Sequence, residues 1–155
     1  MHAKRRDRLR STLKKSGVPA LLVTNEINVT YLTGFTGDSS YLLLTGSDAT
    51  ILTDSRYTTQ LEEESPDVPF VSRTSSTSMV QILQQELKSR KLKSIAVEGD
   101  SLSKNHFDLF TAKLDGVELV STSDWVETLR QIKDRSEMAE ILRSIHLGER
   151  TFDSI

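Results

Sequence analysis

Apolar residues recur along this chain with two different periods, and the two periods alternate. Short runs of apolar and β-branched residues are typical of buried strands, whereas apolar residues three and four positions apart indicate one face of a helix. The runs predict strands over 20–23, 41–45, 49–53, 68–71, 94–97 and 117–120. The helical spacing predicts helices over 3–16, 55–64, 78–90, 103–114 and 125–129, with one helical turn over 28–32.

This alternation is interrupted only by an early hairpin. The segments 41–45 and 49–53 are joined by Gly46-Ser47-Asp48, which are turn-forming residues. Strands that alternate with helices predict an α/β fold, with a mixed sheet of about five or six strands covered by helices on both faces. The strongest apolar runs and stripes predict a core that includes Leu22, Leu43, Ile51, Ile82, Leu83, Ile95, Val97, Phe107 and Phe110.

The last part of the chain departs from the pattern. A helix that begins near Ser136 carries an apolar stripe, and apolar residues continue to Ile155, but no further element follows to cover them. We therefore expect one domain over 1–132 and, over 133–155, a linker helix leading to a further domain. The stripe consists of Met138, Ile141, Leu142 and Ile145. Without a covering domain, this helix is expected to be the least stable element.

The composition mainly excludes certain kinds of site and partner. Of 155 residues, 36% are hydrophobic and 27% are charged, which is ordinary for a soluble globular domain. The absence of cysteine excludes disulfides, thiolate metal sites and cysteine nucleophiles, and it fits a cytoplasmic location. The formal net charge of −2 predicts no general attraction to nucleic acid. No apolar stretch approaches the roughly 20 residues of a membrane span, so we expect no membrane partner.

Positive charge is concentrated at the start of the chain, where lysines and arginines in the first 15 residues outnumber the single acid Asp7. One interpretation is a basic arm that binds nucleic acid or an anionic membrane. The other is a helix that turns Ala3, Leu9 and Leu13 to the core and its charges to solvent. The second is favoured, because no aromatic residue is interleaved for base stacking and the apolar stripe is too thin for a membrane helix.

No motif in the sequence assembles a catalytic centre. The nucleophile-elbow, P-loop and dinucleotide-binding patterns are all missing. His106 and Asp108 lie two positions apart on a predicted helix, so their side chains leave from different faces. His146 and Glu149 share a face, but such pairs are ordinary on a helix surface. We therefore expect no catalytic residue, no metal ligand and no enzymatic activity in this sequence alone.

Three short segments carry the most specific signal. The segment 28–37 reads N-V-T-Y-L-T-G-F-T-G, and 53–57 reads T-D-S-R-Y, with Gln60 shortly after it. The segment 129–134 reads L-R-Q-I-K-D and is followed by Glu137. In this order and spacing, the three segments resemble the N-terminal domain of the Xaa-Pro peptidase family, which includes aminopeptidase P, prolidase and the related creatinase.

The resemblance implies a small α/β domain with a ribonuclease-H-like mixed sheet, followed by a separate catalytic domain. In peptidase members the catalytic domain holds two divalent metal ions (manganese, cobalt or zinc), which activate a water molecule. We therefore expect a non-catalytic N-terminal domain of a metal-dependent Xaa-Pro aminopeptidase or dipeptidase, which shapes substrate access and subunit association. The expected partners are its own C-terminal catalytic domain, further copies in a homodimer or larger oligomer and, in the whole protein, a proline-containing peptide.

Two other functions remain open at this stage. A creatinase-like amidinohydrolase, which cleaves a guanidinium compound without metal, would carry the same kind of N-terminal domain. A free-standing α/β interaction module would have no enzymatic parent. The N-terminal domain does not separate peptidases from amidinohydrolases, whereas the uncovered stripe after Ser136 argues against a free-standing module.

Five residues of the first two segments are candidates for contacts with substrate or a partner subunit. Arg56 has a planar fork suited to a carboxylate, and the resemblance implies that an arginine of this domain can reach a neighbouring subunit's active site. Pairing with nearby acids is its alternative role. Tyr31, Phe35 and Tyr57 are candidates for the wall of a substrate entrance, or else for packing in the core or at an interface. Asp54 is expected to cap the helix after the hairpin.

Overall fold

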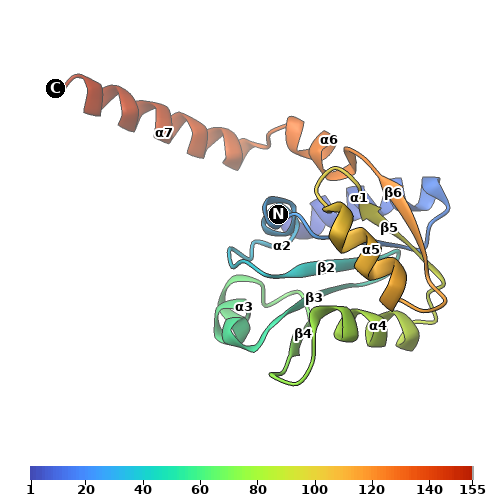
Figure 1. Ribbon diagram of the computed structural model, residues 1–155. Coiled ribbons are helices and arrows are strands. Elements are labelled where there is room, and N and C mark those ends of the chain that lie inside the picture. Colours follow the sequence, from blue (N-terminus) through green and yellow to red (C-terminus); the bar gives the residue numbers. More distant parts are fainter. Residues whose placement is uncertain (155) are drawn as a thin grey trace.

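In the computed structural model, which describes residues 1–154, the strands form a mixed sheet with helices on both faces (Figure 1). Position 155, the end of the expected linker segment, lies outside the described residues. The sheet has six strands in the order β4-β3-β2-β1-β5-β6. They are β1 (Ala20–Val23), β2 (Tyr41–Thr45), β3 (Ala49–Asp54), β4 (Phe70–Arg73), β5 (Ser94–Glu98) and β6 (Glu118–Thr122). The predicted mixed α/β fold is confirmed.

The sheet combines an antiparallel centre with parallel flanks. β1, β2 and β3 pair antiparallel, so the predicted hairpin lies inside the sheet. β4 runs parallel to β3, while β5 and β6 continue parallel from β1. Leu22 lies opposite both Leu43 and Val97, and directly paired residues share a face of the sheet. The register therefore places Leu22, Leu43 and Val97 in one apolar layer, whereas Ile51 packs on the opposite face of the sheet.

The helices divide between the two faces of the sheet. On one face lie α1 (His2–Ser16), α2 (Glu26–Thr33), α3 (Thr58–Glu64) and α6 (Trp125–Gln131). On the other lie α4 (Met79–Ser89) and α5 (Lys104–Lys113). Each layer encloses its own hydrophobic cluster against the sheet. Two cores on opposite faces explain why the central strands β1 and β2 are apolar at nearly every position.

The predicted core is buried with one exception. Leu22, Leu43, Ile51, Ile82, Leu83, Ile95, Val97 and Phe110 are all buried. Phe107 is half-buried instead, and it packs against the edge of the cluster that Phe110 enters. The two rings lie one turn apart on α5, and only Phe110 reaches the centre of that cluster.

Two elements have bounds that differ from the predicted ones. The turn expected over 28–32 is the longer helix α2, because the Asn25 side chain accepts hydrogen bonds from the backbone N–H groups of Ile27 and Asn28. The strand expected over 68–71 is β4, which starts only at Phe70. Val68 is instead buried in a core cluster ahead of the strand.

The first helix also differs from its prediction. Leu9 and Leu13 are buried as expected, but Ala3 is exposed. Arg5 and Arg6, which were expected in solvent, are buried. Both guanidinium groups donate hydrogen bonds to backbone carbonyls of α2 and pair with carboxylates. These partners offset the cost of removing a charge from water.

The last helix, α7 (Arg135–Phe152), projects away from the sheet and its layers (Figure 1). None of its residues within the described part of the chain is buried. Its apolar stripe is between 41% and 49% exposed. Among residues 1–154, every helix is too short or too polar to span a lipid bilayer.

Candidate functional site

The charged turn after the hairpin forms the first candidate site. β3 ends at Asp54, and a short 3₁₀ turn, η1 (Ser55–Tyr57), leads into α3. The Asp54 carboxylate accepts a hydrogen bond of 3.0 Å from the backbone N–H of Arg56. Asp54 therefore caps this turn, and the cap places the Arg56 side chain at the end of the sheet.

The Asp54 carboxylate is shared by two arginines. Arg56 Nε lies 3.0 Å from one oxygen, and Arg73, the register partner of Asp54 on β4, contacts the other. The backbone and side-chain hydrogen bonds from Arg56 hold the pKa of Asp54 below its ordinary value. Asp54 is thus an ionised support for Arg56. Sequence reasoning missed Arg73, because only the parallel pairing of β3 with β4 brings it here.

Arg56 keeps one edge of its guanidinium open. Its side chain is 69% exposed, and within residues 1–154 its hydrogen-bonded partner is Asp54, reached through Nε. The outer nitrogens, Nη1 and Nη2, make no hydrogen bond to another described residue. Such an edge can receive a carboxylate with two parallel hydrogen bonds.

Tyr57 completes this surface group. Its ring lies edge-on to Phe35, with centroids 5.7 Å apart, and its hydroxyl donates to Asp38. That hydrogen bond raises the pKa of Tyr57. The Arg56 guanidinium lies 5.6 Å from the centroid of the Tyr57 ring. We call Asp38, Asp54, Arg56, Tyr57 and Arg73 the Arg56 cluster.

The other two aromatic candidates lie inside the domain. Phe35 is 0% exposed and Tyr31 only 9%. The backbone passes so close over Phe35 that a Cβ at Gly37 would lie 2.2 Å from the ring, so only glycine fits there. Both rings therefore pack within this domain, and neither is presented to solvent beside Arg56.

A second polar group, buried near the carboxyl ends of β1 and β5, escaped the sequence prediction. Asn28 is fully buried, and its amide donates hydrogen bonds of 2.6 Å to both Glu98 and Glu127. Its oxygen accepts from Arg130 at 3.0 Å. Burial raises the pKa of Glu98, although backbone N–H groups, that of Asn25 foremost, also donate to this carboxyl. Every member has a partner, so the group ties α2, β5 and α6 together.

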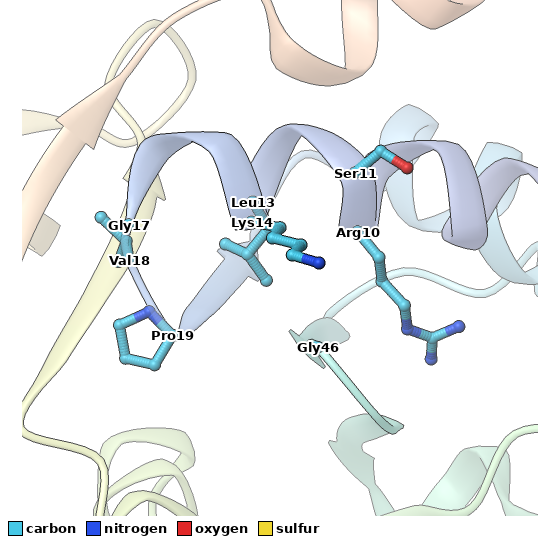
Figure 2. A pocket seen from close by; sticks show the side chains of 8 residues that line it. All are labelled: Arg10, Ser11, Leu13, Lys14, Gly17, Val18, Pro19 and Gly46. Carbon is cyan, nitrogen blue, oxygen red and sulfur yellow. The ribbon is translucent and has the colours of Figure 1, made fainter.

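The hollows in the surface of the domain offer less chemistry. One of about 410 Å³ lies along α1 near the β-hairpin turn (Figure 2). Arg10 in its wall already donates to the Thr45 carbonyl and pairs with Asp7, whereas Lys14 makes no hydrogen bond or ion pair to another residue of the described part of the chain. Within residues 1–154, His, Asp and Glu side chains form no group of three or more that could hold a metal ion.

The fold and its motif residues match a known family. A family model of the creatinase/prolidase N-terminal domain matches residues 5–132. The chain belongs to this family. It is 27% identical over 149 residues to the uncharacterized peptidase YqhT of Bacillus subtilis, an alignment that covers 96% of this chain and 42% of that protein.

Solved structures show the same creatinase/prolidase domain. An Xaa-Pro dipeptidase from Bacillus anthracis superimposes with a TM-score of 0.83 at 27% identity, over 90% of this chain and 38% of that one. The N-terminal domain of the cytoplasmic peptidase PepQ from Mycobacterium tuberculosis gives 0.73 at 30% identity, over 81% and 98%. The chain thus spans about two fifths of the full-length relatives.

In this creatinase/prolidase domain, the motif at 28–37 contacts both other motifs. Phe35 packs on Tyr57 in the second motif. On the other side of α2, Tyr31 donates its hydroxyl hydrogen to the Leu129 carbonyl at 3.1 Å, and Asn28 accepts from Arg130. The motif at 28–37 therefore serves mainly to hold the three motifs together. Arg56, in the neighbouring motif, is the residue whose guanidinium keeps an edge open to solvent.

Proposed function

We propose that this chain is the non-catalytic N-terminal domain of a metal-dependent Xaa-Pro aminopeptidase or dipeptidase. Family membership over 5–132 and the likeness to an Xaa-Pro dipeptidase support this proposal. Likeness to an X-Pro aminopeptidase from Thermotoga maritima, with a TM-score of 0.81 at 27% identity, supports it equally. The two divalent metal ions would be bound by a catalytic domain that follows α7.

The observation that carries the proposal is the uncovered face of α7. The chain covers 38% to 42% of the relatives that are longer than one domain, so those proteins contain more than twice its length. A stripe formed by Met138, Ile141, Leu142 and Ile145 is about half exposed in this chain. We assign this stripe to contact with the catalytic domain, since a continuous apolar face is typical of an interaction surface.

Within this function, the Arg56 cluster is the proposed contact with substrate or with a neighbouring subunit. Arg56 is held at Nε by Asp54 and faces solvent with its remaining nitrogens. Its partner would be a carboxylate, supplied by a peptide end or by an acidic side chain of another copy in an oligomer. Tyr57 adds a half-buried ring beside it. A cytoplasmic location, as for the relative PepQ, belongs to the same proposal.

The activity test compares two proteins. The longer protein, in which this chain precedes its catalytic domain, should hydrolyse Xaa-Pro peptides when manganese or cobalt is added. The chain of 155 residues should be inactive under the same conditions. Turnover that stays with the isolated chain through purification would overturn the proposal, and cleavage of creatine instead of Xaa-Pro peptides would favour the amidinohydrolase branch.

Arg56→Ala in the longer protein should lower kcat/KM roughly tenfold or more, with an almost unchanged melting temperature. Its open edge makes few contacts within this domain, so the fold should tolerate the change. Arg143→Ala is the matched control, because Arg143 is 77% exposed and its ion-pair partner among the described residues is Glu140 on its own helix. Loss of the isolated domain's fold, with the parent's kcat/KM intact, would make Arg56 a structural residue.

A further inference from the structure

A buried arginine connects the domain to the start of α7. Arg5 lies on α1 and is only 7% exposed. One of its terminal nitrogens donates to the Tyr31 carbonyl at 3.0 Å, and the other donates to Asp134 at 2.9 Å and lies 3.2 Å from Glu137. Its guanidinium carbon also lies 4.0 Å from the centroid of the Tyr31 ring. One planar cation thus contacts α2 and the first turn of α7 together.

Both carboxylates are already fixed by the helix that carries them. Asp134 accepts from the backbone N–H groups of Ser136 and Glu137, and Glu137 accepts in return from the backbone of Asp134. This reciprocal capping box holds the two side chains in one position relative to the axis of α7. An ion pair to capped carboxylates therefore holds the whole helix, rather than two mobile side chains.

The connection between α6 and α7 adds little apolar packing to hold α7 against the domain. Only residues 132–134 separate α6 from α7, and Ile132 among them is 73% exposed. A hollow of about 380 Å³ beside the joint has polar walls that include Tyr31, Arg130 and Glu137. Without Arg5, a short exposed connection next to an open hollow would let α7 swing.

We propose that Arg5, Asp134 and Glu137 form a latch that fixes the direction in which α7 leaves the domain. Tyr31 supports the latch from the domain side. Its carbonyl accepts a hydrogen bond from Arg5, and its hydroxyl donates one to the Leu129 carbonyl near the end of α6. Resting on the proposed function, the latch sets where the Arg56 cluster lies relative to a catalytic domain joined to α7. Arg5, Asp134 and Glu137 are positioning residues in this account, and they touch no substrate.

The latch can be tested by a distance measurement, because the chain contains no cysteine and two introduced cysteines carry the only spin labels. Labels at Asn105→Cys on α5 and Glu149→Cys on α7 report the angle between α7 and the domain. Double electron–electron resonance should give one narrow distance peak, similar to that of a reference pair at Asn105→Cys and Glu62→Cys within the domain. These three positions are exposed.

The decisive variant combines Asp134→Asn with Glu137→Gln. Asparagine and glutamine keep the hydrogen-bonding pattern of the capping box but remove both negative charges opposite Arg5. Circular dichroism should show that α7 stays helical, while the distance distribution from α5 to α7 should become at least about twice as wide. The matched control is Glu140→Gln with Arg143→Gln, which removes an ion pair internal to α7 and should leave the width unchanged.

Arg5→Lys tests the latch from the domain side, so that altered capping in α7 cannot explain both results. Lysine keeps the charge but lacks the fork that reaches the Tyr31 carbonyl and the two carboxylates together, so an intermediate width is expected. A distribution that is already broad in the unchanged chain, or one that stays narrow in both variants, would overturn the latch. The measurement needs no catalysis, so its outcome is independent of whether the parent is a peptidase.

Discussion

The helices α4 and α7 follow the same local pattern but have different surroundings. Each starts at a reciprocal capping box, Ser78 with Gln81 in α4 and Asp134 with Glu137 in α7. Each carries an apolar stripe along one face. The α4 residues Ile82, Leu83 and Leu87 are between 0% and 3% exposed, whereas the α7 stripe is between 41% and 49% exposed.

The comparison separates what forms a helix from what stabilises it. Capping and periodicity are sufficient to specify both helices, but most of a helix's stability in a protein comes from packing its apolar face. In α4 the sheet supplies that packing. In α7 the described chain supplies the latch at the first turn and a contact from the Ser136 hydroxyl to the Met1 sulfur. The same pattern therefore marks a core element in one place and an uncovered apolar face in the other.

The largest expected difference concerns matched leucines. Leu83→Ala in α4 should lower the free energy of unfolding by ~2–5 kcal/mol, because Leu83 is fully buried and its removal leaves a cavity. Leu142→Ala in α7 should change it by less than about 0.5 kcal/mol in this chain. Urea unfolding of the two variants measures both values. Equal losses would show that α7 packs against the domain in solution.

A smaller difference is expected between the two caps. Ser78→Ala should lower the free energy of unfolding by ~1 kcal/mol, because α4 unfolds with the domain. Asp134→Ala should reduce the helical signal of α7 in circular dichroism, yet lower the urea midpoint of the domain less than Ser78→Ala does, because Glu137 remains 3.2 Å from the buried Arg5 guanidinium. A shift of that midpoint as large as that of Ser78→Ala would contradict the separation of α7 from the core.

The smallest expected effect is the pH dependence contributed by two carboxylates, one inside the domain and one at the start of α7. Glu98 lies in the domain and burial raises its pKa, whereas hydrogen bonds from Ser136 and the Glu137 backbone, with Arg5, lower the pKa of Asp134. Ionised Glu98 therefore disfavours the folded state as pH rises through its folded pKa. Asp134 instead favours the folded α7 end above the unfolded aspartate value, and this contribution is lost as pH falls through its folded pKa.

A carbon NMR titration resolves the two groups. The Glu98 midpoint is expected above the ordinary glutamate value of 4.5, and that of Asp134 below the ordinary aspartate value of 3.8. The latch should therefore stay closed through the neutral range and open only in strong acid. An Asp134 midpoint at or above 3.8 would show that the Arg5 contact and the cap do not form in solution.

Elements were predictable from the sequence where one segment carries the whole signal. Apolar runs alone predict the strands at 20–23 and 41–45, because such runs are typical of buried strands. The helical spacing of its apolar residues alone predicts α4, because one face of that helix must be buried. Asp54 was predictable as a cap, because capping depends on residues two positions apart. The fold class followed from the order of such elements.

Contacts between distant segments were not predictable in this way. Arg5 and Asp134 are 129 positions apart, and nothing in a run of charged residues shows which arginine is buried. Arg73 joins the Arg56 cluster only through the parallel pairing of β3 with β4. Tyr31 and Phe35 have no local feature that separates a core aromatic from an exposed one. The polar interactions of the candidate site therefore required the structure.

Amide hydrogen exchange of α4 and α7, in this chain and in the proposed longer protein, tests the central claim most directly. In a dilute monomer of the chain, α7 amides should exchange far faster than those of α4, because no residue of α7 is buried. In the longer protein, a catalytic domain should cover residues 138–145 and slow their exchange towards that of α4. Protection of α7 equal to α4 in the isolated monomer, or fast exchange of α7 in both proteins, would contradict the account.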